Sequence, residues 1–184
     1  MADVHYALVT YLKGPIGEFV ENLRRELHPE LPHSAAHLTV LPPRCLQGTE
    51  AQALETLEEI CGGVEPFEVT LGEVETFIPN TPTVFIRVVH AASRMKELHD
   101  QLNVNALFCT EEWEYMPHLT IVKMPREEQA QNAYRMARRR WAKYEGPRAI
   151  QVKELTFVRE DKLNCWIDLA EVPLGGRLVS PSRS

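Results

Sequence analysis

The chain has 184 residues, 44% of them apolar and 25% charged, which is typical of a globular protein with one domain or with two small lobes around a shared core. Its net charge of −6 argues against a protein that coats long nucleic acid, because such binding depends on many contacts between basic side chains and phosphates. A small site for one or two phosphates is compatible with this charge.

Several further features point to a cytoplasmic protein. No apolar run reaches 18 residues, so no membrane span is expected, and the start of the sequence lacks the pattern of a signal peptide. The four cysteines, Cys45, Cys61, Cys109 and Cys165, are scattered without a Cys-x-x-Cys pair, so we expect reduced thiols.

The first half of the chain predicts alternating strands and helices. The expected elements are a strand over 4–12, a helix over 16–27, a strand over 37–41, a helix over 49–61 and a strand over 67–78. Pro42-Pro43 is expected to end the second strand, and Thr49 to cap the helix that follows.

The second half repeats this order. The expected elements are a strand over 83–89, a helix over 91–102, a loop over 103–117, a strand over 118–123, a helix over 125–144 and strands over 149–158 and 164–169. Val4 precedes His37 by 33 residues and Val84 precedes His118 by 34, which indicates an internal duplication. We therefore predict a single α+β domain of two pseudo-symmetric lobes, about 1–80 and 81–174, with a loose tail over 175–184. Two antiparallel sheets should surround a central cleft, with helices outside.

A short motif occurs once in each half. His37-Leu38-Thr39-Val40 and His118-Leu119-Thr120-Ile121 both place histidine and threonine two residues apart. In a strand, such residues face the same way, so each motif should present His and Thr together and bury its aliphatic residues. In a shuffled chain of this composition, two His-Leu-Thr tripeptides have odds on the order of one in a thousand.

This doubled motif in a duplicated α+β chain resembles the two-histidine phosphoesterase superfamily, and in particular its 2′-5′ RNA ligase and cyclic phosphodiesterase (LigT-like) branch. Pro117, before the second histidine, also fits. The first motif departs from the pattern, because Leu41-Pro42-Pro43 follows it where relatives often carry an aromatic residue and a glycine.

The resemblance implies a metal-independent phosphoesterase of RNA processing that needs no cofactor. It would act as a monomer on a nucleotide or RNA terminus with a 2′,3′-cyclic phosphate or a 2′-5′ linkage, and could carry out 2′-5′ RNA ligation in reverse. His37 and His118 would be acid and base, with the two roles not assigned, and Thr39 and Thr120 would hold the phosphate. The two histidines fit acid–base catalysis independently of the family resemblance, because histidine can give or take a proton near neutral pH.

Three further residues are weaker candidates. Lys123 occupies the place of a basic phosphate contact in some relatives, but strict alternation puts it opposite His118 unless the strand ends or bulges first. Trp113 and Tyr115 could stack on a base, or they could cap the core from their loop.

Other interpretations of the motifs remain open. The histidines and threonines could be structural residues of two strands, or His37 and His118 could bind a metal with a nearby carboxylate, although no metal-ligand spacing supports this. The alternative function is a non-catalytic nucleotide or RNA-end binding module on the same fold.

Overall fold

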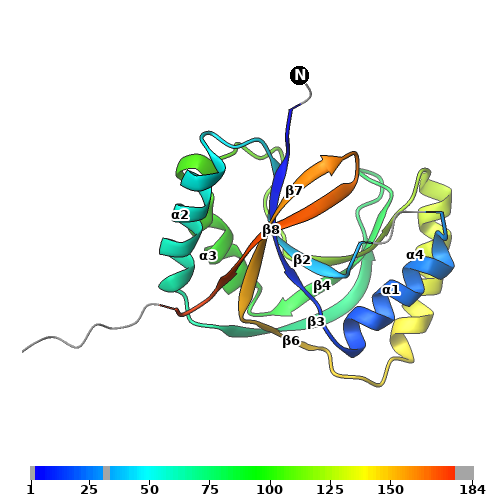
Figure 1. Cartoon of the computed structure of the whole chain (residues 1–184). Coiled ribbons are helices and arrows are strands. Elements are labelled where there is room, and N and C mark those ends of the chain that lie inside the picture. The colour runs from blue at the N-terminus through cyan, green and yellow to red at the C-terminus, as the bar shows by residue number, and fades with distance from the viewer. Residues whose placement is uncertain (1–2, 31–33, 177–184) are drawn as a thin grey trace, which may run out of the picture.

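The computed structural model describes residues 3–30 and 34–176, which form a mixed α and β structure (Figure 1). Its helices are α1 (Pro15–Leu27), α2 (Glu50–Gly62), α3 (Ala92–Leu102), the 3-10 helix η1 (Asn105–Leu107) and α4 (Glu127–Ala142). Its strands are β1 (Tyr6–Tyr11), β2 (His37–Arg44), β3 (Phe67–Thr76), β4 (Thr83–His90), β5 (His118–Lys123), β6 (Ala149–Val152), β7 (Glu154–Lys162) and β8 (Cys165–Pro173).

The strands form one antiparallel sheet in the order β6-β3-β4-β5-β2-β1-β7-β8. This confirms the predicted α+β class with antiparallel strands and outer helices. The two expected sheets are the two halves of this sheet, joined where β2 meets β5 through the single residue pair Leu38 and Leu119. The two motif strands are therefore neighbours at the centre.

Each half of the sheet contains strands from both halves of the sequence. β3 pairs with β4 and β6, whereas β7 and β8 extend the sheet beyond β1. The continuous strand predicted over 149–158 is wrong, because it is interrupted at Lys153: β6 ends at Val152 and pairs with β3, whereas β7 begins at Glu154 and pairs with β1. This crossing interlocks the two halves, so neither sequence half alone makes a complete half of the sheet.

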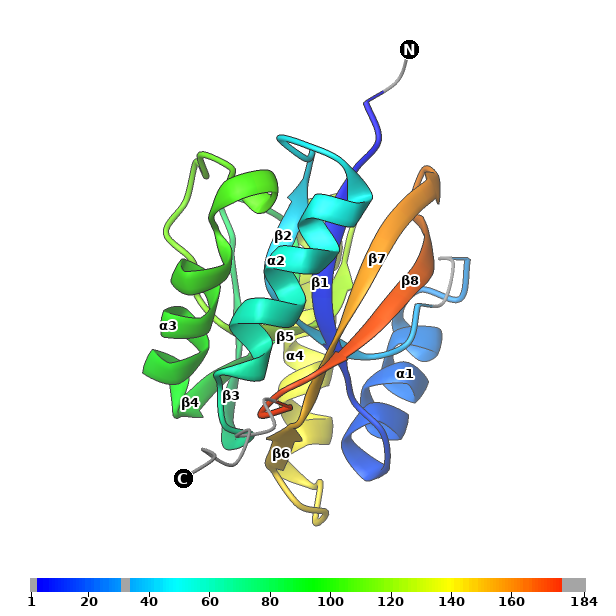
Figure 2. The ribbon, with the colours of Figure 1, turned by 60° about the vertical axis from the view of Figure 1, so that its left-hand side comes forward.

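The helices cover one face of the sheet, which we call the covered face. α1 and α4 lie side by side, and α2 and α3 lie together elsewhere on the molecule (Figures 1 and 2). All four helices contribute to the large core, and α2 begins with the expected cap at Thr49, completed by Gln52 in a capping box. None of the described helices combines the length and the apolarity needed to cross a bilayer.

The opposite face carries a small apolar cluster of Ala7, Val9 and Val158, with Tyr11 and Trp166 packed against it. We call this the open face. No helix residue belongs to this cluster, so the open face keeps polar side chains within reach of a ligand.

The second strand extends beyond its predicted end at Leu41. β2 continues through Pro42-Pro43 to Arg44, because the prolines fall in an irregular stretch between the Leu8–Leu41 and Tyr6–Arg44 pairs, and prolines are tolerated at such irregularities. Most of the predicted tail, residues 177–184, lies outside the described residues.

Leu38→Ala should destabilise the protein by about 2–5 kcal/mol, because the fully buried Leu38 packs where the two sheet halves meet. Urea unfolding would measure the change. Leu163→Ala is the matched control, since Leu163 is 84% exposed and its truncation should stay within about 0.5 kcal/mol. Equal midpoints for the two variants would contradict a structural role for this junction.

Candidate active site

The two motif strands have the same burial pattern over their first five residues. In β2 and in β5, histidine and threonine are half-buried while the three aliphatic residues around them are buried. Leu38 and Leu119 belong to the large core on the covered face. His37, Thr39, His118 and Thr120 therefore project together from the open face, as alternation along a strand requires.

The same irregularity follows each motif. The register shifts by one residue between the pairs Val9–Thr39 and Leu8–Leu41 in β2, and between Phe85–Thr120 and Val84–Val122 in β5. Each motif strand thus carries one extra residue, which is a β-bulge. Because a bulge reverses the alternation, the aliphatic residues on both sides of it can be buried.

The bulge in β5 decides where Lys123 lies. Lys123 pairs with Thr83, which shares the face of Phe85 and Thr120, so Lys123 lies on the open face with His118. Its side chain is exposed. Lys123 was expected to share the face of His118 only if the strand ended or bulged before it, and this bulge meets that condition. Pro42 holds the equivalent position in β2.

The junction of β2 and β5 sets the arrangement of the four motif side chains. When the Leu38–Leu119 register is extended by one residue, His37 lies opposite Thr120 and Thr39 opposite His118. The two histidines are then diagonal neighbours, a relationship that typically spaces residues roughly 7–8 Å apart, with their Cβ atoms somewhat closer. Both rings can reach toward one group between them.

The two imidazoles are held in the same way. The Nδ1–H of His37 donates to the carbonyl oxygen of Ala35 at 2.8 Å, and that of His118 donates to Met116 at 2.7 Å. A carbonyl can only accept, so Nδ1 carries a proton in each ring and Nε2 is left to take or give one. Neither Nε2 has a hydrogen-bond partner within the described ranges.

Both histidines have a depressed pKa. Desolvation by burial is the main cause for each ring, and the hydrogen bond to a backbone carbonyl opposes it. Positive charge adds to the effect: Arg24 and His118 lower the pKa of His37, and Arg87 lowers that of His118. The electrostatic coupling of the two rings means that protonation of one disfavours protonation of the other.

A different residue stands beside each histidine on the next strand. Tyr11 pairs with His37, and Arg87 pairs with His118. Both are bound to a carboxylate: the Tyr11 hydroxyl donates to Asp168 at 2.6 Å, and Arg87 binds Glu75 through Nε and Nη2 at 2.7–2.9 Å. The two surroundings share this plan but differ in charge, because the donor beside His37 is a neutral tyrosine and the donor beside His118 is a cationic arginine.

Aromatic rings also border His118. Phe77 and Phe85 stack on each other with centroids 4.1 Å apart, and each meets the imidazole at a steep angle, 5.1 and 5.2 Å away. This packing excludes water from one side of the ring and contributes to its desolvation.

The motif strands are supported from the covered face by side chains that bind their carbonyl groups. β2 and β5 share a single residue pair, so other carbonyls along this seam need other partners. Arg24 of α1 donates to Thr120 at 3.0 Å and to Ile121 at 2.7 Å, and the Tyr115 hydroxyl donates to Thr39 at 2.8 Å. Each threonine is therefore fixed through its own backbone.

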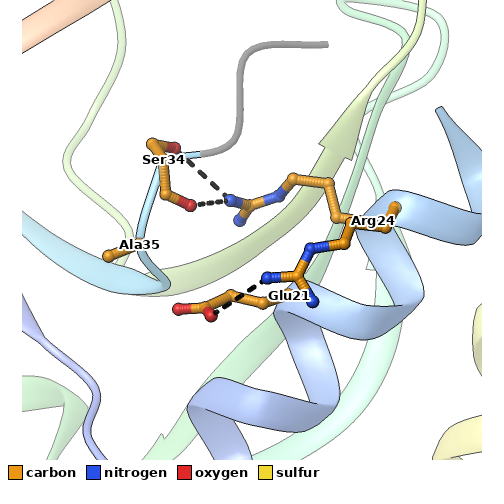
Figure 3. Close-up of a pocket in the computed structure, with 5 residues that line it drawn as sticks. Glu21, Arg24, Ser34 and Ala35 are labelled. Atoms are coloured by element: carbon orange, nitrogen blue, oxygen red, sulfur yellow. Dashed lines mark hydrogen bonds and ion pairs between the residues drawn. The ribbon is translucent and has the colours of Figure 1, made fainter. Parts of the chain in front are cut away.

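The segment before His37 is anchored to α1 as well. Figure 3 shows Arg24 directed at Ser34, whose carbonyl and hydroxyl oxygens accept from its guanidinium. Glu21 accepts from the backbone N–H of Ala36 at 3.0 Å. These residues line a cavity of about 230 Å³ that contains none of the four motif residues, so it supports the site rather than forming it.

The two aromatic candidates differ from each other. The ring of Tyr115 stacks on His99 at 4.2 Å with an interplanar angle of 4°, and it packs against the large core. These contacts are those of the core-capping alternative. Trp113 is 65% exposed in the loop before β5, and its stacking on a base stays a prediction.

The metal alternative lacks a third ligand in the part of the chain that the structure describes. No three His, Cys, Asp or Glu side chains come together there in a group that could hold a metal ion.

Comparison with known proteins agrees with this geometry. The model of the 2′-5′ RNA ligase superfamily matches residues 12–164, which is most of the chain. The chain belongs to this superfamily, and the predicted relationship to the LigT-like branch of two-histidine phosphoesterases is confirmed.

Individual relatives are distant. BH1439 of Halalkalibacterium halodurans, named as a candidate phosphoesterase, is 27% identical over 119 residues, which cover 64% of this chain and 69% of that protein. E. coli LigT in complex with NADP+ superposes with a TM-score of 0.62 at 17% identity, over 94% of this chain and 98% of LigT. TT0787 of Thermus thermophilus also gives 0.62, at 15% identity, over 95% and 100% of the two chains.

Sequence reasoning did not single out Tyr11, Arg87 or Arg24. Arg87 left one signal, since it is the only charged residue in the apolar stretch Thr83–Val89. Tyr11 and Arg24 left none, because their partners are far along the chain: Asp168 lies on β8, and the carbonyls that Arg24 binds lie on β5.

Tyr115→Phe should lower the free energy of unfolding by about 1–3 kcal/mol, because it leaves the Thr39 carbonyl without its donor while keeping the ring. Chemical denaturation would show the loss. Trp113→Phe is the control, and its exposed side chain predicts a change within about 0.5 kcal/mol. If the Tyr115→Phe variant were as stable as the wild-type protein, the structural interpretation of Tyr115 would be rejected. Base stacking would then be the favoured interpretation.

Proposed function

We propose that the protein is a metal-independent phosphoesterase that opens 2′,3′-cyclic phosphates, or cleaves 2′-5′ linkages, at nucleotide or RNA ends. The observation that carries this proposal is the pairing of two equally held histidines on adjacent central strands. The Nε2 atom of each ring has no partner in the described structure. Each histidine also lies opposite the threonine of the other motif. Such a pair suits a reaction that needs an acid and a base at one phosphorus atom.

In the proposed reaction, one neutral histidine takes a proton from water through Nε2 while the water oxygen bonds to phosphorus. The bond between phosphorus and one ribose oxygen breaks, and the second histidine, protonated at Nε2, gives its proton to that oxygen. The products are a phosphomonoester and a free ribose hydroxyl. When a ribose hydroxyl takes the place of water as the nucleophile, the same steps join that hydroxyl to the cyclic phosphate and give a phosphodiester, which is the chemistry of 2′-5′ ligation.

Thr39, Thr120 and Lys123 would bind the phosphate. Within the described ranges the two threonine hydroxyls have no protein partner, so they are free to donate to non-bridging oxygens, where negative charge collects in the transition state. Lys123, on the same face, would add a positive charge. The backbone contacts from Arg24 and Tyr115 would keep both threonines in place as charge develops.

The relatives support the class of ligand. E. coli LigT has been crystallised with 3′-AMP and, separately, with phosphate; both structures have a TM-score of 0.59 to this chain. The alternative, a binding module without catalysis, needs phosphate contacts but no titratable pair. Two histidines with matched tautomers therefore favour the enzyme.

His37→Ala and His118→Ala should each lower cyclic phosphodiesterase turnover on the order of 10²-fold or more, since each removes one proton-transfer partner. Thr39→Ala and Thr120→Ala should cost less, and the double histidine variant should be little worse than either single one, because the rings act in one step. Phosphorus NMR of nucleoside 2′,3′-cyclic phosphates, incubated in EDTA, would follow the reaction.

His90→Ala is the matched control, because His90 is exposed and has no place in the motifs. It should retain wild-type turnover. Near-normal turnover by a folded His37→Ala or His118→Ala variant would contradict the two-histidine mechanism. If the wild-type protein lost its activity in EDTA and recovered it when a divalent ion was added, the protein would be a metal-dependent hydrolase.

The optimum of kcat/KM should lie on the acidic side of pH 6.5. Both histidines have pKa values below the ordinary histidine value of about 6.5, so the form with one neutral and one protonated ring is most populated below it. As pH rises, the proton donor is lost; as pH falls, the base is lost. Initial rates between pH 4.5 and 8.5 would test this, and an optimum above pH 7 would contradict it.

A further inference from the structure

Comparing the two motif strands helps to distinguish residues that bind the reacting phosphate from residues that bind other parts of the substrate. In the proposed site, the reacting phosphate would lie between two motifs that have the same histidine and threonine residues. Positions beside the histidines that are equivalent by register but differ in chemistry can distinguish one end of a substrate from the other. Tyr11 and Arg87 are such a pair.

Arg87 lies next to the site on the open face. It is the direct cross-strand partner of His118, a relationship that typically places Cβ atoms about 4.5–5.5 Å apart. Its side chain is 42% exposed, so the guanidinium is accessible from solvent.

The guanidinium has one occupied edge and one free edge. Glu75 takes the edge formed by Nε and Nη2, at 2.7–2.9 Å, and so fixes the plane of the group. Nη1 has no partner in the described part of the chain. The edge formed by Nη1 and Nη2 thus keeps a pair of N–H donors, in the fork geometry that matches two oxygens of a phosphate.

We propose that Arg87 forms a subsite for a second phosphate group, next to the reacting one, so that substrates with a further phosphate are preferred over simple nucleoside cyclic phosphates. This subsite rests on the proposed function. Tyr11, at the equivalent position, is uncharged, and its hydroxyl is already bound to Asp168. Tyr11 therefore cannot bind a phosphate in the way that Arg87 can. The substrate is accordingly oriented with its extra phosphate toward β4.

The second phosphate can come from the next internucleotide linkage or from a terminal phosphomonoester, and three substrates distinguish these. They are a nucleoside 2′,3′-cyclic phosphate, the same compound with a 5′-phosphate, and a dinucleotide ending in a 2′,3′-cyclic phosphate. The readout is the kcat/KM of each phosphate-bearing substrate divided by that of the simple one. Effects of a substitution on folding or on the pKa of His118 act on all three substrates and cancel in this ratio.

Arg87→Gln should lower the ratio about tenfold for the preferred substrate, as expected for losing charge-assisted hydrogen bonds at a half-exposed site. Tyr11→Phe, at the equivalent position, is the control and should leave the ratio within about twofold. A ratio that is unchanged in the Arg87 variant, or that falls equally in the Tyr11 variant, would overturn the subsite.

A binding measurement separates this proposal from the proposed function. The affinity of the wild-type protein for a dinucleotide 3′-phosphate, divided by that for a nucleoside 3′-phosphate, should also fall about tenfold in the Arg87 variant. If the wild-type protein turned over none of the cyclic substrates, the phosphoesterase function would fail, and this affinity ratio would still decide the subsite: a fall supports it and no change refutes it.

Discussion

The contact between β2 and β5 at Leu38 and Leu119 is the constraint on which the rest of the site depends. Among the described residues it is the only pair that links the two halves of the sheet, and both leucines are completely buried. Because histidine and threonine flank each leucine, fixing this pair places all four polar side chains around one point on the open face. The core on the covered face thus positions groups that it does not itself contact.

The narrowness of this junction has consequences for the backbone. Two strands that share one pair leave carbonyl groups that a full ladder would have satisfied, and side chains behind the sheet bind them instead. Arg24 from α1 and Tyr115 from the loop before β5 each support a threonine of the opposite sequence half. Each motif is therefore held by a side chain from the other half of the sequence.

The two motif strands match each other at the centre of the sheet, and their surroundings differ. The bulges, the histidine tautomers and the two threonines are matched between the halves. One strand away, a neutral tyrosine faces an arginine at the equivalent position. A phosphate is nearly symmetric and a nucleotide is not, so symmetric contacts at the centre and different ones beside it suit a substrate built from both.

Much of this protein was determined by the sequence alone. Alternation along a strand predicted that His37 and Thr39 share a face, as His118 and Thr120 do, and the doubled motif with matched spacing indicated the family and the antiparallel α+β class. These features depend on local periodicity, which a sequence displays directly. The tertiary structure decided the rest. A bulge that is visible only in the pairing with β4 sets the side of the sheet on which Lys123 lies. The fold also brings Tyr115 into contact with Thr39 and His99, and it places Arg87 beside His118. Such features arise when residues distant in sequence meet, and no local pattern encodes which of them will do so.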